Sequence, residues 1–157
     1  MVTASLEHIS DRIRHLVYLD AFVPENGETV LGHALGMGRP TIEIGMSWTM
    51  PPAEREFDKK SEGEWMRLRR TPHPLGCFTE PVFLEKPLEN FEFSRTYIKA
   101  SMNPDSDPGA DALWKAANRA KDSSAWEYQE IATTHMVANN EPKALSEILL
   151  QVVSCKA

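Results

Sequence analysis

The run HLVYLD, from His15 to Asp20, constrains the fold more than any other stretch of the sequence. It is continuously apolar instead of alternating, and it stops at an acid. Such a run predicts a strand that is covered on both faces, as in a parallel sheet. The breakers Pro24 and Gly27 follow at once and end the strand.

A second strand is predicted at residues 94–101 (SRTYIKAS), where β-branched and aromatic residues gather, and a third at 125–132 (AWEYQEIA), where Trp126 and Tyr128 alternate with Glu127, Gln129 and Ile131. A helix is predicted between them at residues 109–122, because alanine and leucine recur there at helical spacing. Another helix follows at 141–154, and a short one is expected within 2–14. Strands separated by helices predict an α/β fold with about three parallel strands and flanking helices.

The middle of the chain has a different character. Between residues 29 and 92, prolines recur and large apolar side chains are scattered among them. We interpret this part as an irregular, mostly helical insertion and not as a sheet-forming segment. The predicted organisation is therefore a core helix and strand at 1–28, the insertion at 29–92, and core strands and helices at 93–157.

Composition excludes several classes of function. The net charge of −6 argues against nucleic acid as a partner, and the cluster of Arg67, Arg69 and Arg70 is typical of a solvated turn. No apolar run approaches the roughly 18 residues of a membrane span, and the first residues lack the pattern of a signal peptide. Cys77 and Cys155 form no disulfide framework, which favours a reducing, cytoplasmic setting.

Metal and cofactor sites are not expected. The five histidines show none of the spacings of known metal sites. The glycines of LGHALGMGRP match neither a dinucleotide-binding fingerprint nor a phosphate-binding loop with its lysine.

Acidic and basic side chains follow each predicted strand. Asp20 comes after the first strand, Asp105 and Asp107 after the second, and His135 after the third. Chemistry in parallel sheets sits at the carboxyl ends of the strands, where these residues are expected to meet. A neutral imidazole can take a proton from a hydroxyl nucleophile while a carboxylate behind it stabilises the imidazolium. The same residues also suit a structural histidine, a loop-shaping Asp20 and a helix-capping turn at Asp105–Asp107.

Three segments carry a family resemblance. RIRHLVYLDAFVPENG, RTYIK and WEYQEIATTHMVANNEPKALSEILL resemble the last three core strands of the α/β-hydrolase fold, in its small esterase group of salicylate and methyl-ester hydrolases and hydroxynitrile lyases. The insertion resembles the cap of that group. The resemblance covers essentially the whole chain. It implies a serine-type hydrolase of small carboxylic esters, with His135 at the position of the triad histidine.

The sequence departs from the family at the nucleophile. The nucleophile elbow, G-x-S-x-G, belongs on the strand before HLVYLD, and MVTASLEHIS resembles the helix that follows it. A loop that supplies one oxyanion-hole amide is also missing. We therefore expect this chain alone to be inactive by the serine route.

No residue inside the chain replaces that nucleophile convincingly. Ser47 in IGMSWT is the nearest imitation, but Pro51 and Pro52 prevent the helix that an elbow requires. Cys77 has no neighbouring base or helix start.

The sequence leaves three candidates for the acid partner of His135: Asp20, Asp105 and Asp107. The acid position of the family falls at Asn103, which cannot be an anion. Asp105 and Asp107 lie slightly later, and the interval from Asp107 to His135 suits the family. Asp20 competes, because some α/β-hydrolases carry the acid after the earlier strand.

The remaining expectations concern substrate and partners. Trp48 and Trp65 are candidate substrate-binding residues under the cap, although simple packing would also explain them. Without an elbow strand, HLVYLD would leave an open apolar edge. That edge predicts a homo-oligomer, or pairing with a missing amino-terminal segment, and allows an alternative function as a non-catalytic interaction protein.

Overall fold

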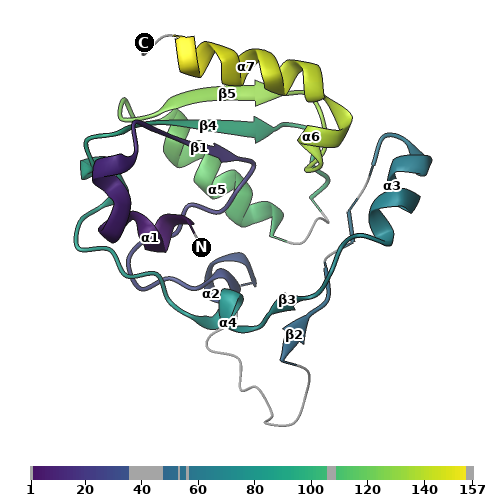
Figure 1. The fold of residues 1–157 in the computed structure, drawn as a ribbon, viewed down its shortest axis with the longest axis horizontal. Coiled ribbons are helices and arrows are strands. Elements are labelled where there is room, and N and C mark those ends of the chain that lie inside the picture. The colour runs from purple at the N-terminus through teal and green to yellow at the C-terminus, as the bar shows by residue number, and fades with distance from the viewer. Residues whose placement is uncertain (1, 36–47, 53, 56, 106–108, 155–157) are drawn as a thin grey trace.

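A parallel sheet forms the centre of the protein. The computed structural model describes residues 2–35, 48–52, 54–55, 57–105 and 109–154. Within them, strands β1 (His15–Leu19), β4 (Ser94–Ala100) and β5 (Glu127–Ile131) pair in the order β1-β4-β5, and both pairs are parallel. The prediction of three parallel strands separated by helices is confirmed (Figure 1).

Helices cover both faces of this sheet. Helix α5 (Ala110–Lys121) lies against one face, and α7 (Pro142–Ser154) lies over the other (Figure 1). Side chains of β4 alternate between the two, so Tyr97 belongs to the core on the α5 side and Ile98 to the core under α7. The central strand β4 is buried on both faces, as expected for a strand inside a parallel sheet covered by helices.

The larger core lies on the α5 side. Helix α1 (Val2–Ile9) contributes Leu6, which is fully buried, and η1 (Ser10–Arg12) leads from it into β1. Helix α5 presents small side chains and so packs closely against the sheet. The buried members of this cluster are Leu6, Tyr18, Val23, Val82, Leu84, Leu88, Phe91, Phe93, Tyr97, Ala116, Ala117, Ala120 and Trp126.

The insertion contains short elements. They are α2 (Val30–Leu35), β2 (Thr49–Met50), α3 (Lys60–Arg67), β3 (His73–Pro74), α4 (Gly76–Thr79) and η2 (Leu88–Asn90). Strands β2 and β3 pair antiparallel, so the expectation that this segment forms no sheet was wrong in that detail. Such a pair is too short to leave a periodic signal in the sequence.

The end of the insertion belongs to the main core. Val82, Leu84 and Leu88 are buried in the cluster that contains Leu6 and Tyr97. The boundaries drawn at residues 28 and 92 stay a prediction, but the chain already packs against the sheet from Val82 onward.

Candidate active site

Asp20 ends β1 in an unusual backbone conformation. Its φ is 41°, the only positive φ of a non-glycine residue in the described ranges, and its N–H donates to the carbonyl of Ile98 at 2.7 Å. Aspartate tolerates this left-handed region better than most residues. The sharp turn keeps the side chain inside the protein, where it is 1% exposed.

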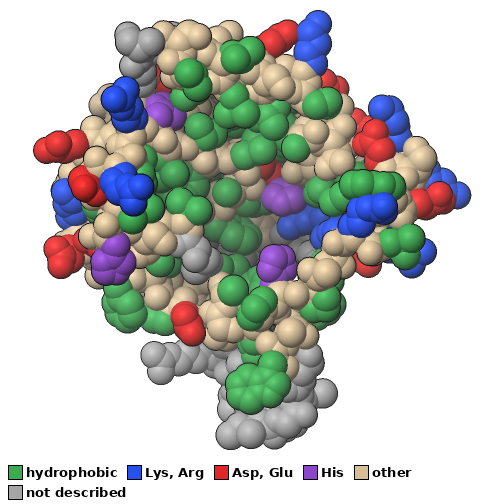
Figure 2. Space-filling view, viewed as in Figure 1, with side chains coloured by type: hydrophobic (Ala, Val, Ile, Leu, Met, Phe, Trp, Pro, Cys, Tyr) green, Lys and Arg blue, Asp and Glu red, His purple; other side chains and the backbone are tan. Residues whose placement is uncertain are grey.

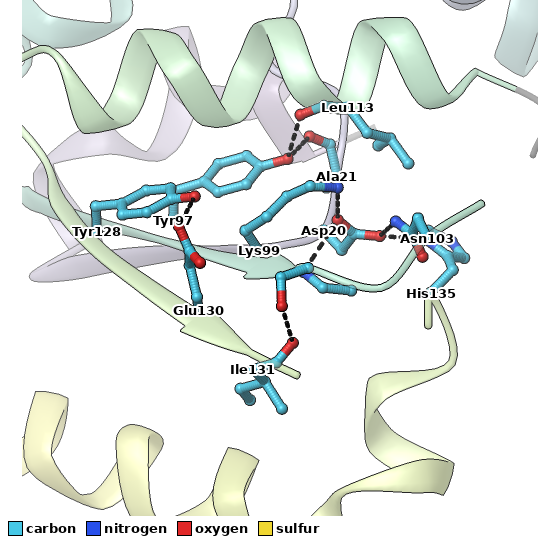
Figure 3. A network of polar contacts seen from close by, with 12 residues as sticks. Asp20, Ala21, Tyr97, Lys99, Asn103, Leu113, Tyr128, Glu130, Ile131 and His135 are labelled. Carbon is cyan, nitrogen blue, oxygen red and sulfur yellow. Dashed lines mark hydrogen bonds and ion pairs between the residues drawn. The ribbon is translucent and has the colours of Figure 1, made fainter. Parts of the chain in front are cut away.

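Four donors surround the Asp20 carboxylate (Figure 3). Oδ1 accepts from Nζ of Lys99 at 2.8 Å and from the backbone N–H of Ala100 at 3.2 Å. Oδ2 accepts from Nδ2 of Asn103 at 2.7 Å and lies 2.7 Å from Nδ1 of His135. The carboxylate is therefore saturated with hydrogen bonds.

These contacts determine the charge of Asp20. Burial alone would raise its pKa, but the hydrogen bonds from His135, Lys99 and Asn103 outweigh burial and lower the pKa below its usual range. Asp20 is consequently an anion at neutral pH. An anion only accepts, so Nδ1 of His135 carries the proton.

His135 lies in the loop between β5 and α6 (Val137–Asn140), with its side chain 28% exposed. Because Nδ1 donates to Asp20, Nε2 is the atom available to take a proton. Within the described residues, no hydroxyl or thiol group bonds to Nε2. The arrangement is an imidazole held by a carboxylate, and none of the described side chains contacts Nε2 as a nucleophile would.

Backbone and amide contacts fix the loop that carries His135. Nδ2 of Asn140 donates to the hydroxyls of Thr133 at 3.1 Å and Thr134 at 2.9 Å. The N–H of Met102 donates to the carbonyl of Thr133 at 3.0 Å, which joins the loop after β4 to the loop after β5. These hydrogen bonds hold the loop that carries His135 in place.

The structure describes two of the three candidate acids, Asp20 and Asp105. Asp20 is the one in contact with His135, whereas the side chain of Asp105 is exposed. Asp107 and Ser47 lie outside the described residues. Asn103, which occupies the expected acid position, instead donates to the carboxylate of Asp20.

The two candidate substrate-binding tryptophans are both at the surface. Trp48 is 87% exposed and Trp65 is 54% exposed, with the guanidinium of Arg69 4.0 Å from the centre of the Trp65 ring. Their contact with a substrate stays a prediction.

An apolar cavity of about 350 Å³ runs along the outer side of β1. Its lining includes Val2, Tyr18, Leu19, Phe22, Val30 and Val82. Figure 2 shows hydrophobic side chains gathered over the middle of the face that Figure 1 views. The cavity is bordered by Leu19 and Ala21, so it reaches the end of β1 where Asp20 lies.

The described residues show neither a metal-binding cluster nor a membrane-spanning helix. The described residues contain no group of three or more histidine, cysteine, aspartate or glutamate side chains placed to hold a metal ion. None of the described helices has both the length and the apolar character needed to cross a bilayer.

Comparison with known proteins places the fold. No family model matches the sequence, and no curated protein matches it significantly. Solved structures do: an extracellular α/β-hydrolase from a Paenibacillus species, described as sharing structural and functional homology with tobacco salicylic acid binding protein 2, superposes with a TM-score of 0.71 at 16% identity, over 96% of this chain and 66% of that chain.

The chain has the α/β-hydrolase fold. The pyrethroid hydrolase PytH is similar too, with a TM-score of 0.61 at 17% identity over 98% of this chain and 65% of that chain. A further PytH structure gives 0.59 at 18% identity, over 99% and 68%. The chain therefore spans about two thirds of the length of the structures it matches.

Sequence reasoning overlooked Lys99 and Asn140. Lys99 is a charge at an inward position of a strand whose neighbours are all buried, which is a detectable signal. Asn140 is the last residue of the short helix α6 and carries no comparable signal.

Proposed function

We propose that this chain supplies the general base and the acid of a serine-type hydrolase of small carboxylic esters. His135 is the base, Asp20 is its orienting acid, and the serine nucleophile comes from polypeptide outside this sequence. The observation that carries the proposal is the 2.7 Å contact between Nδ1 of His135 and Oδ2 of Asp20.

The chemistry follows from the orientation of the imidazole. Nε2 takes the proton of the serine hydroxyl as its oxygen attacks the ester carbonyl, and it returns that proton to the leaving alkoxide. Asp20 stabilises the imidazolium that forms between these steps. Water then repeats the cycle on the acyl-enzyme.

Fold and cavity support an ester as the substrate class. The structural neighbours include a pyrethroid hydrolase, and the cavity that ends beside Asp20 has an apolar lining that would suit an alkyl or aromatic group. We also keep a reducing, cytoplasmic setting as a proposal, in accord with the free thiol of Cys77.

Hydrolysis of 4-nitrophenyl acetate tests this function. The chain alone should react at the rate of its unfolded or buffer control, because nucleophile, base and oxyanion hole act as a unit. If the DNA just upstream of Met1 encodes an in-frame G-x-S-x-G, the chain extended by that segment should be active. There, His135→Ala or Asp20→Asn should lower kcat about 10³- to 10⁴-fold.

A matched control is His8→Ala, which removes an exposed histidine from α1 and should leave the rate unchanged. Enzyme-like hydrolysis by the chain alone, abolished by His135→Ala, would contradict an external nucleophile. Hydrolysis by the extended protein that does not depend on His135 would contradict the proposed base.

A second candidate function is an interaction protein that binds through the edge of its sheet. The observation in its favour is that, within the described residues, β1 pairs only with β4 and has the apolar cavity on its other side. Open edges of this kind pair with other chains. A mass by light scattering that stays monomeric at all concentrations would count against self-association.

A further inference from the structure

Lys99 lies where a lysine is rarely found. It sits on the central strand β4, and its side chain is 0% exposed. An ammonium group in such a place costs several kcal/mol unless it is paired and hydrogen-bonded. Its partner is the equally buried carboxylate of Asp20, at 2.8 Å.

Lys99 and His135 contact different oxygens of the Asp20 carboxylate. Lys99 engages Oδ1, together with the N–H of Ala100, whereas His135 and Asn103 engage Oδ2. Each oxygen therefore has its own pair of donors. With Oδ1 held by a cation on the rigid central strand, the carboxylate cannot rotate without breaking a buried ion pair, and Oδ2 stays directed at Nδ1 of His135.

The surroundings of Lys99 hold it in turn. Its Nζ lies 4.5 Å from the centre of the Trp114 ring, on α5, which is a favourable cation–π distance. Figure 3 shows the Lys99 side chain extended beneath α5 toward Asp20. The neighbouring titratable group on the same face of β4, Tyr97, bonds instead to the carbonyls of Ala21 and Leu113.

We propose that Lys99 is a positioning residue for the catalytic base: by holding Oδ1 of Asp20, it keeps Oδ2 turned toward Nδ1 of His135. This inference rests on the proposed role of His135 as general base. It assigns to the hydrolase a cation behind the acid, so that the orientation of the base depends on three side chains instead of two.

The test is NMR of the purified chain, with no substrate. The hydrogen-bonded Nδ1 proton of His135 should give a resonance downfield of the backbone amides, assigned by its loss in Asp20→Asn. Lys99→Met, which keeps the length of the side chain without its charge, should lose that resonance at neutral pH. Lys99→Arg should retain it, and Lys121→Met, at a surface ion pair of α5, should leave it unchanged.

A Lys99→Met protein that folds and keeps the resonance unchanged would overturn the proposal. Because that variant could fail to fold, the wild-type chain offers an independent measurement, the titration of the Asp20 carboxyl carbon. The hydrogen bonds from His135, Lys99 and Asn103 should together keep the pKa of Asp20 below its usual range, and a titration within or above that range would overturn the proposal as well.

These outcomes are separate from those of the ester assay. If the Nδ1 resonance of His135 depends on Lys99 but ester hydrolysis by the extended protein does not depend on His135, Lys99 aligns Asp20 and His135 is not the catalytic base. If hydrolysis depends on His135 but is insensitive to Lys99→Met, His135 is the catalytic base and Lys99 does not position it.

Discussion

At the scale of single residues, Asp20 combines two unfavourable features. Its φ of 41° is in a region that costs about 1–3 kcal/mol for a residue with a Cβ atom, and its carboxylate is fully buried. Both are tolerated because Lys99, Ala100, Asn103 and His135 satisfy the two oxygens. Backbone strain with a saturated charge is typical of residues held for function.

Replacing this carboxylate should change the pH dependence of stability. Since the pKa of Asp20 is lowered by folding, its stabilisation is present above the unfolded value near 3.8 and is lost as pH falls through the folded value. At neutral pH, Asp20→Asn should lower the free energy of unfolding by about 3–5 kcal/mol, because Lys99 is left buried without its partner. Below the usual aspartate range, the difference between the two proteins should shrink.

Urea unfolding at a series of pH values from 7 to 3 measures this difference. Glu147→Gln is the control, because Glu147 makes only an exposed pair with Lys143 on α7, at 4.0 Å. A constant gap between wild type and Asp20→Asn over the whole series would contradict the ionised, buried carboxylate.

The site was only partly predictable from sequence. The apolar run that ends at Asp20 and the loop position of His135 were visible, because strand ends in a parallel sheet mark functional positions. Spacing along the chain could not choose between Asp20 and the Asp105–Asp107 pair, since the choice depends on the turn at Asp20. Lys99 was treated as a strand residue because propensity ignores which face a side chain occupies.

At the scale of elements, Glu89 ties three parts of the chain together. From η2, its carboxylate accepts from Nε and Nη2 of Arg119 on α5 at 2.9 and 2.8 Å, and from Nε1 of Trp126 before β5 at 3.0 Å. Burial alone would raise the pKa of Glu89, but the bonds from Arg119 and Trp126 lower it. The end of the insertion is thereby fastened to the α5 side of the sheet.

Glu89→Gln should therefore destabilise the fold by about 1–3 kcal/mol, because the paired arginine contact becomes a neutral one. Thermal and urea unfolding followed by circular dichroism will measure it. The nearby Glu92 is exposed, so Glu92→Gln should stay within about 0.5 kcal/mol of wild type. Equal effects of the two changes would contradict the role of Glu89.

Helices and strands were predicted correctly where the segment was long enough to show a recognisable pattern. The strands were found from a continuous apolar run at β1, β-branched and aromatic residues at β4 and alternation at β5, and the helices α5 and α7 from their helical repeat. The pair β2–β3 and the four-residue helices α4 and α6 were not found, because tertiary contacts decide such short segments.

At the scale of the whole molecule, β1 is an edge of the sheet within the described residues. The sheet continues from β1 to β5 in one direction only within the described residues, and the cavity on the other side is apolar. About a third of each solved α/β-hydrolase that it resembles lies outside the part that this chain matches. We expect association through this surface.

Val2→Asp should weaken that association. Val2 lines the cavity and is 63% exposed, so a charge there disfavours an apolar partner without disturbing the core. Light scattering over a concentration series should give a lower mean mass than wild type. Val153→Asp, at an equally exposed apolar position on α7, is the matched control, and an equal decrease there would contradict binding at β1.

The separation of Asp20 and His135 along the chain has a kinetic consequence. The two residues are 115 positions apart, and they meet only when β1 and β5 have both joined β4. Parallel pairs of this kind close long loops and form late, so the acid–base contact should be among the last to appear during refolding. The resonance of the Nδ1 proton of His135 would then report the final step of folding, after the helices have already formed.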